Sequence, residues 1–204
     1  NHIDAFSFTL FRLFFGAFTL VLIYAYKTKN ISVNLKSNWL SSFMLFLYAI
    51  SFSYSFLNME AGLGTLLLFA VVQIVMLVFS LFHKEKINLQ KILGMSIALF
   101  GLIYLLYPKE SFEVSLYHAF LMIIAGVAWA IYTVLGKKST SSLYNTMDNF
   151  RKAVVFVGLF YILFSLLIVL FNLKKINIKH LPVFVIIFTA ILIAILFSVN
   201  PYLI

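Results

Sequence analysis

Long, unbroken apolar runs dominate this sequence of 204 residues. Each approaches the roughly 20 residues that an α-helix needs to cross a bilayer core. Strands of a membrane barrel would instead alternate apolar and polar residues. The runs therefore predict an all-α fold, a polytopic transmembrane helix bundle. About seven helices are expected, spanning approximately residues 5–26, 39–58, 61–82, 90–107, 116–136, 148–172 and 181–200.

The composition excludes the soluble classes of protein. Hydrophobic residues make up 64% of the chain and charged residues only 10%, whereas an ordinary soluble domain has about 45–50% and about 25%. The 24 Phe and 11 Tyr exclude a disordered chain. Cysteine is absent, which excludes a secreted disulfide scaffold.

The basic residues lie mainly in short segments between the apolar runs. Fifteen Lys and Arg oppose six Asp and Glu, and this placement indicates membrane orientation, with no nucleic-acid partner expected. The lysines of segments 27–38, 83–91 and 137–152 predict that these segments are cytoplasmic and that the N-terminus is outside. The lysines of segment 174–179 are an exception, because this orientation would place them outside the cell. We expect a multi-pass protein of a bacterial cytoplasmic (inner) membrane.

Two apolar runs begin alike, with Phe11-Arg12 and Phe150-Arg151. Superposing the two arginines shifts run 39–58 onto 178–197, close to the last run. The match predicts a protein of two five-helix repeats with opposite orientation. Residues 1–107 would be the first repeat without its first helix, and 116–204 the second without its last two. Inverted repeats commonly hold a transporter's substrate between them.

Several stretches carry a family resemblance. They are DAFSFTLFRLFFGAF at 4–18, residues 61–105 with Gly94 and Gly101, and FLMIIAGVAWAIYTVLGKK at 120–138. Together they resemble the ten-helix EamA-type branch of the drug/metabolite transporter superfamily. The resemblance implies export of amino acids, related metabolites or drugs. One departure is Gln73, at a position where that family often has Pro.

Arg12 is the most unusual charged residue of the apolar runs. It lies about seven residues, or about 10 Å, inside its predicted helix. A charge at such depth is costly and usually faces a cavity or a partner. Arg12 is therefore a candidate anchor for a substrate carboxylate or for an ion pair. The alternative is that its long side chain reaches out to the membrane surface.

A polar stripe follows the second run, with Tyr48, Ser51, Ser55 and Asn58 at helical spacing. These groups could face a substrate cavity or could form hydrogen bonds between helices. Gln73, in the middle of the third run, has the same two possible roles. A buried amide needs hydrogen-bond partners, which a cavity or a neighbouring helix could supply.

One face of the 116–136 run combines small residues with Trp129. Trp129 could supply an aromatic wall with one hydrogen-bond donor, and the nearby Tyr132 could add a hydroxyl. Helix packing is the alternative explanation. The small residues Gly94, Ala98 and Gly101 form a seam on another run, which favours helix packing and could support a homodimer.

No Asp or Glu lies at the centre of a predicted helix, so the sequence offers no proton-coupling carboxylate. The four His lie apart and Cys is absent, so neither a metal nor a cofactor is expected. The chain is predicted to be a transporter and not an enzyme. It would export small organic metabolites, such as amino acids or aromatic compounds, by alternating access. Its cavity would be lined by Arg12, Tyr48, Ser51, Gln73, Trp129 and Tyr132.

Two alternatives remain open from the sequence. The chain could be a transport-inactive membrane fragment or scaffold. It could also be an intramembrane lipid-modifying enzyme, although its His, Asp and Glu residues are scattered and such an enzyme would need them clustered. The expected partners are a small-molecule substrate and the lipid bilayer.

Overall fold

The computed structural model describes residues 4–28, 39–83, 89–106, 115–137, 139 and 141–172. Over these residues the chain is all-α, without strands, as the apolar runs predict. Three helices, α1, α3 and α5, are long and apolar enough to cross a membrane. The predicted helix at 181–200 lies outside the described residues. The six helices are α1 (Ala5–Thr28), α2 (Trp39–Ser55), α3 (Ala61–Phe82), α4 (Leu89–Leu106), α5 (Leu116–Gly136) and α6 (Ser142–Asn172).

The first five helices begin and end within about three residues of the predicted runs, because length and hydropathy determine them locally. The sixth helix differs. It begins at Ser142, six residues before the predicted start. The backbone N–H of Asn145 donates to the Ser141 carbonyl, and the Thr146 hydroxyl donates to the Ser142 carbonyl. Asp148 therefore lies nearly two turns inside α6.

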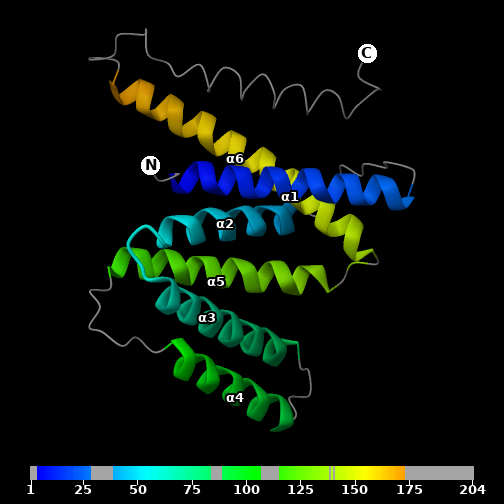
Figure 1. Cartoon of the computed structure of the whole chain (residues 1–204), viewed down its shortest axis with the longest axis vertical. Coiled ribbons are helices and arrows are strands. Elements are labelled where there is room, and N and C mark those ends of the chain that lie inside the picture. The colour runs from blue at the N-terminus through cyan, green and yellow to red at the C-terminus, as the bar shows by residue number, and fades with distance from the viewer. Residues whose placement is uncertain are drawn as a thin grey trace.

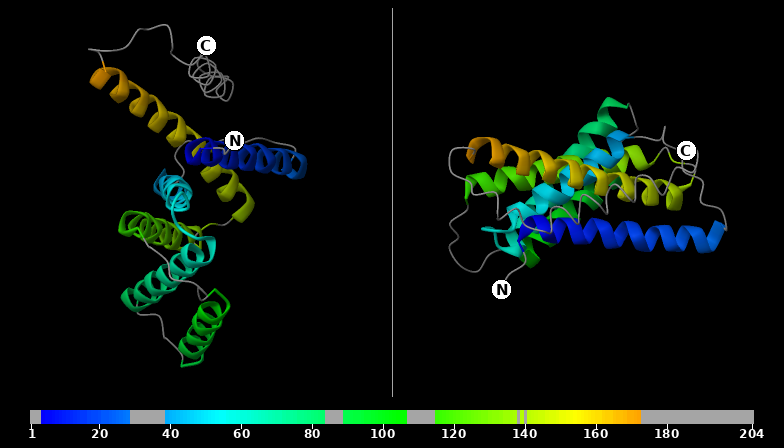
Figure 2. Two further views of the ribbon diagram at one scale, coloured as in Figure 1. Left: turned by 60° about the vertical axis from the view of Figure 1, so that its left-hand side comes forward. Right: turned by 90° about the horizontal axis from the view of Figure 1, so that it is seen from above.

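The helices follow one another along the long axis of the molecule in the order α6, α1, α2, α5, α3, α4 (Figure 1). Helix α2 packs against α1, α5 and α6, and α3 packs against α5. Helix α4 packs against α3 at one end of this row, as the left view in Figure 2 shows. The centre of the molecule is thus formed by α1 and α2, with α6 packed on one side of them and α5 on the other.

Two buried apolar clusters hold the helices together. The larger joins α1, α2 and α6 around Leu13, Leu45 and Val157, and the smaller joins α3 and α5 around Leu68 and Met122. Many large apolar side chains point outward, which suits a protein surrounded by lipid tails. Phe15, Phe18 and Leu22 of α1 are examples, since more than half of each is exposed.

Glycines mark the closest helix approaches. A Cβ at Gly16 would lie 2.7 Å from the Phe150 ring, so α1 and α6 meet closely at the two segments that share the Phe-Arg pattern. At Gly126 a Cβ would lie 2.8 Å from Val71, where α5 meets α3. Around Gly94 and Gly101 no atom of the described chain lies within 4 Å of such a Cβ, so the homodimer stays a prediction.

Candidate functional site

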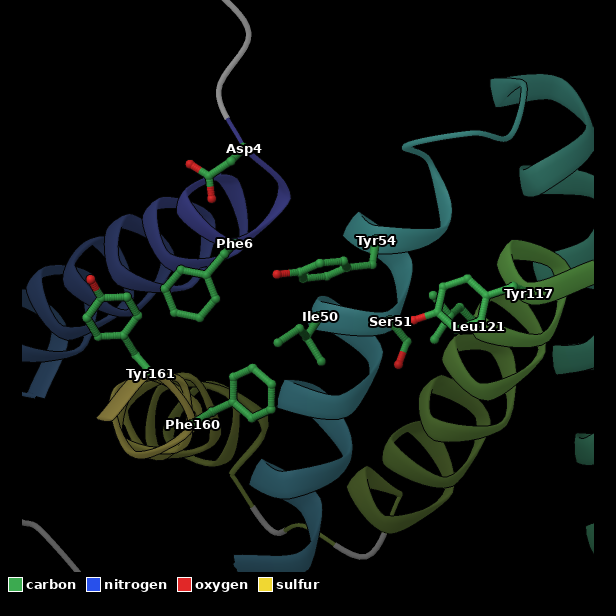
Figure 3. A pocket seen from close by; sticks show the side chains of 9 residues that line it. All are labelled: Asp4, Phe6, Ile50, Ser51, Tyr54, Tyr117, Leu121, Phe160 and Tyr161. Carbon is green, nitrogen blue, oxygen red and sulfur yellow. The ribbon is translucent and has the colours of Figure 1, made fainter. Parts of the chain in front are cut away.

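A cavity of about 480 Å³ lies among α1, α2, α5 and α6, with α1 and α6 on one side of α2 and α5 on the other (Figure 3). Its volume falls within the range typical of small-molecule sites. Four helices contribute to its walls. The cavity lies near the N-terminal ends of α1 and α5 and the C-terminal end of α2. The lining residues are Asp4, Phe6, Ile50, Ser51, Tyr54, Tyr117, Leu121, Phe160 and Tyr161.

Aromatic rings dominate one wall of the cavity. The Phe6 ring stacks on Tyr161 with 5.1 Å between centroids and on Phe160 with 6.5 Å. The hydroxyls of Tyr54 and Ser51 belong to the opposite wall, on α2 (Figure 3). Flat apolar faces with a few hydroxyl groups can hold a small ring and orient its polar substituents.

Asp4 is the charged residue among the cavity's lining residues, and it also begins helix α1. One of its carboxylate oxygens accepts a hydrogen bond of 3.0 Å from the backbone N–H of Ser7. Hydrogen bonding to Ser7 favours the ionised form and lowers the pKa of Asp4 below its ordinary value, although partial burial opposes the shift. The Asp4 carboxylate therefore satisfies a free N–H of the first turn.

Arg12 does not line this cavity. One guanidinium N–H donates a 3.1 Å hydrogen bond to the Ala49 carbonyl of α2. The guanidinium carbon also lies 5.6 Å from the Phe8 ring centroid, 5.5 Å from Tyr48 and 5.3 Å from Phe52. Rings at this distance attract a cation through their π faces. Arg12 thus joins α1 to α2, with a carbonyl and three rings as its partners.

Three further predicted residues form a continuous aromatic series beside Arg12. Tyr48 contacts Trp129 at 4.6 Å between ring centroids, and Trp129 contacts Tyr132 at 5.5 Å. All three are partly buried against the larger apolar cluster. The structure thus brings together Arg12, Tyr48, Trp129 and Tyr132, and these residues lie beside the cavity, outside its lining.

The polar residues of the α2 stripe have both of the roles that the sequence allows, which are cavity lining and hydrogen bonding between helices. Ser51 lines the cavity. Ser55 donates a 2.7 Å hydrogen bond to the His118 carbonyl of α5, and the Asn58 amide lies 3.5 Å from the His118 ring. Only part of the stripe therefore faces the cavity, and the rest connects helices.

Gln73 lies apart from the other predicted site residues. It is half-buried on α3, which packs against α5 and α4, and it does not line the cavity described above. The structure therefore separates Gln73 from Ser51 and from the Arg12 group.

A second polar centre, not predicted as a site from the sequence, lies at the other end of the bundle. Asp148 is 2% exposed, Asn149 1% and Lys152 2%. One Asp148 oxygen accepts a 2.6 Å hydrogen bond from Arg151 and the other a 2.7 Å hydrogen bond from Lys152. The sequence suggested that these charges belong to a cytoplasmic segment. Their spacing of three and four residues, on one face of an apolar helix, is the signal that could have revealed them.

Asn149 links this centre to α2. Its amide nitrogen donates to the Ser41 hydroxyl, and its amide oxygen accepts from the Ser42 hydroxyl, both at 3.1 Å. The Lys152 ammonium also lies 5.0 Å from the Trp39 ring centroid. Together these contacts hold the first turn of α2 against α6.

The EamA-like transporter family model matches residues 1–107, which is just over half of the chain. The chain belongs to this family. The match covers α1 to α4, and with them Arg12, Tyr48, Ser51 and Gln73. The family and the apolar helices together make the chain a multi-pass membrane protein.

Proteins with related sequences agree with this family. An uncharacterised protein of Pseudomonas aeruginosa is 38% identical over 162 residues, which are 79% of this chain and 56% of the relative. The uncharacterised transporter YoaV of Bacillus subtilis is 28% identical, over 62% of this chain and 45% of its own length. An uncharacterised transporter of Archaeoglobus fulgidus is also 28% identical, with 55% and 41% covered. No solved structure matches the chain.

The chain spans about half the length of the curated relatives it matches. The cavity described above is therefore that of this chain alone, without the further length that the relatives have.

Proposed function

We propose that the complete protein moves a small organic solute across the cytoplasmic membrane of a bacterium by alternating access. The cavity lined by α1, α2, α5 and α6 is the observation that carries this proposal. Helices α1 and α2 belong to one predicted repeat, 1–107, and α5 and α6 to the other, 116–204. Transporters built from inverted repeats commonly bind their substrate between the two repeats.

The proposed substrate is a small metabolite with an apolar or aromatic part and a polar group, such as an aromatic amino acid, and the proposed direction is export. The stacked rings of Phe6, Phe160 and Tyr161 support the apolar preference. The Ser51 and Tyr54 hydroxyls would orient the polar group. Arg12, Tyr48 and Trp129 do not line the cavity but would hold its α2 wall in place. Arg12 would do so by positioning α1 on α2.

The experiment is an efflux assay of the complete protein with radiolabelled aromatic amino acids, in cells and in proteoliposomes. Tyr161→Ala removes one stacked ring, and we expect transport at low substrate concentration to fall roughly three- to tenfold, since an aromatic pair contributes about 0.5–1.5 kcal/mol beyond its area. Tyr161→Phe keeps the ring and should transport nearly as well.

Ile74→Ala is the matched control, because Ile74 is 58% exposed on α3 and does not line this cavity. Equal transport by Tyr161→Ala and Ile74→Ala, at equal amounts of folded protein, would remove this cavity from the substrate path. Absence of flux by the unmodified complete protein across a broad metabolite screen would contradict the transport function itself.

A further inference from the structure

The buried charges of α6 have no role in the cavity. Asp148 and Lys152 are almost completely buried near the start of α6, a helix whose first turns are polar and whose remainder is apolar. Ionisable groups at such positions are costly, and their pairing seldom adds net stability. In membrane proteins they usually mark a functional element.

These charges pair within a single helix, with two cations on one carboxylate. Arg151 and Lys152 both bind the Asp148 carboxylate, and all three residues belong to α6. A movement of α6 as a rigid body would therefore leave both ion pairs intact. Besides the apolar packing of α6 against α1 and α2, such a movement would break the hydrogen bonds that join Asn149 to Ser41 and Ser42 of α2.

The polar centre and the cavity lie at opposite ends of the same helices. On α2, Ser42 and Ser51 are nine residues, or about 14 Å, apart, and on α6, Asn149 and Phe160 are eleven residues, or about 16 Å, apart. At the cavity end the helices leave an open space, whereas at the other end Ser42 and Asn149 are completely buried against each other. The bundle is thus open at one end and closed at the other.

The closed end is the one that the lysines assign to the cytoplasm. Helix α1 ends there with Lys27, and α5 is followed there by Lys137, both exposed. In Figure 1 this is the end at which α2 and α6 begin. The positive-inside rule places such residues in the cytoplasm.

We propose that Asn149 of α6, with Ser41 and Ser42 of α2, forms the cytoplasmic gate of the transport pathway, and that Arg151 and Lys152 keep the Asp148 carboxylate paired when the gate opens. The proposal rests on the transport function proposed above. Hydrogen bonds suit a gate because water replaces them when the helices separate. Tyr132 of α5 also interacts with the Asn149 side chain, so the gate is bordered by α5 as well as α2.

The test measures access to the cavity from the cytoplasm. Ser51→Cys places one thiol in the cavity of a chain that has no other cysteine. In inside-out membrane vesicles of the complete protein, with cysteines elsewhere replaced, a membrane-impermeant thiol reagent then reports access from the cytoplasmic side. We expect slow labelling, and at least a tenfold increase when Asn149→Ala is added.

Asn58→Ala is the matched control, because it removes an asparagine at the opposite end of α2 and should leave the labelling rate unchanged. Ser42→Ala removes the second partner, and it should raise the rate as Asn149→Ala does, which covers the case in which Asn149→Ala fails to fold. Labelling that is equally fast in all variants, or equally slow, overturns the gate. The labelling needs no substrate, so a protein that gates but moves none of the metabolites tested would contradict only the proposed function.

Discussion

At the scale of single residues, burial and partners decide what a polar group does in this bundle. Arg12 illustrates this, because its guanidinium is bound by the Ala49 carbonyl and lies over three aromatic rings. The same carbonyl also accepts a 2.9 Å hydrogen bond from Ser53. Arg12 therefore contributes to the α1–α2 contact and to the position of Tyr48.

The first prediction concerns this contact. Arg12→Ala removes the charged hydrogen bond and the cation–π contacts, and should lower the free energy of unfolding by about 1–3 kcal/mol. Arg12→Lys keeps the charge and should lose less. Thermal unfolding in one detergent measures the difference. Lys27→Ala, at the exposed end of α1, is the control, and a loss as large as that of Arg12→Ala would contradict the assignment.

Asp4 leads to a pH-dependent prediction. Its pKa is lowered in the folded protein, mainly by hydrogen bonds to Ser7. A lowered pKa stabilises the folded state above the unfolded-state value, and this contribution disappears as the pH falls through the folded-state pKa. Hydrogen exchange at the Ser7 amide should therefore lose protection below about pH 4. Asp4→Asn, corrected for intrinsic exchange, should not show this loss. An identical pH profile for both proteins would contradict the role of the Asp4 charge.

At the scale of helices, small residues determine how closely two helices approach. A Cβ at Gly126 of α5 would lie 2.8 Å from Val71 and 3.1 Å from the Leu68 carbonyl, so this position has no room for a side chain. Gly94 of α4 faces open space. The two glycines thus allow a matched comparison of the same substitution.

We expect Gly126→Ala to destabilise the protein and Gly94→Ala to leave it unchanged or slightly more stable. Forcing a methyl group into a packed contact costs typically about 1–3 kcal/mol, whereas Ala in place of Gly within a helix gains roughly 0.5–1 kcal/mol. Unfolding temperatures of the two variants in the same detergent would measure the opposite signs. A gain in stability from Gly126→Ala would mean that α3 and α5 lie farther apart.

At the scale of the whole molecule, the cavity and the polar centre lie at different levels along α2 and α6. Opening one level while closing the other requires α2 and α6 to move relative to each other. A covalent link across the closed end should therefore stop transport without removing the cavity.

The Ser42 and Asn149 side chains, 3.1 Å apart, offer a site for such a link. In the complete protein, the double variant Ser42→Cys/Asn149→Cys should lose at least tenfold in transport after mild oxidation and regain it with a reducing agent. Each single variant should be unaffected by oxidation. Undiminished transport by the fully cross-linked protein would show that this end does not open.

The helical segments could be predicted because hydropathy and length are properties of short stretches of chain. The runs at 5–26, 61–82 and 116–136 needed no knowledge of their neighbours. The start of α6 was placed too late, because its polar first turns resemble a surface segment unless α2 is known to cover them. Ser51 lines the cavity and Arg12, Tyr48, Trp129 and Tyr132 contact one another in series, while their role in substrate binding stays a prediction.

By itself, then, the sequence determined the fold class, the helical segments and the family resemblance. Only the tertiary structure decided which polar groups meet: Ser51 faces the cavity while Ser55 binds α5, and Asn149 meets Ser42 across more than a hundred residues of chain. The physical reason is that a helix forms from interactions within about four residues, whereas the direction of each side chain depends on how helices distant in the sequence rotate and cross.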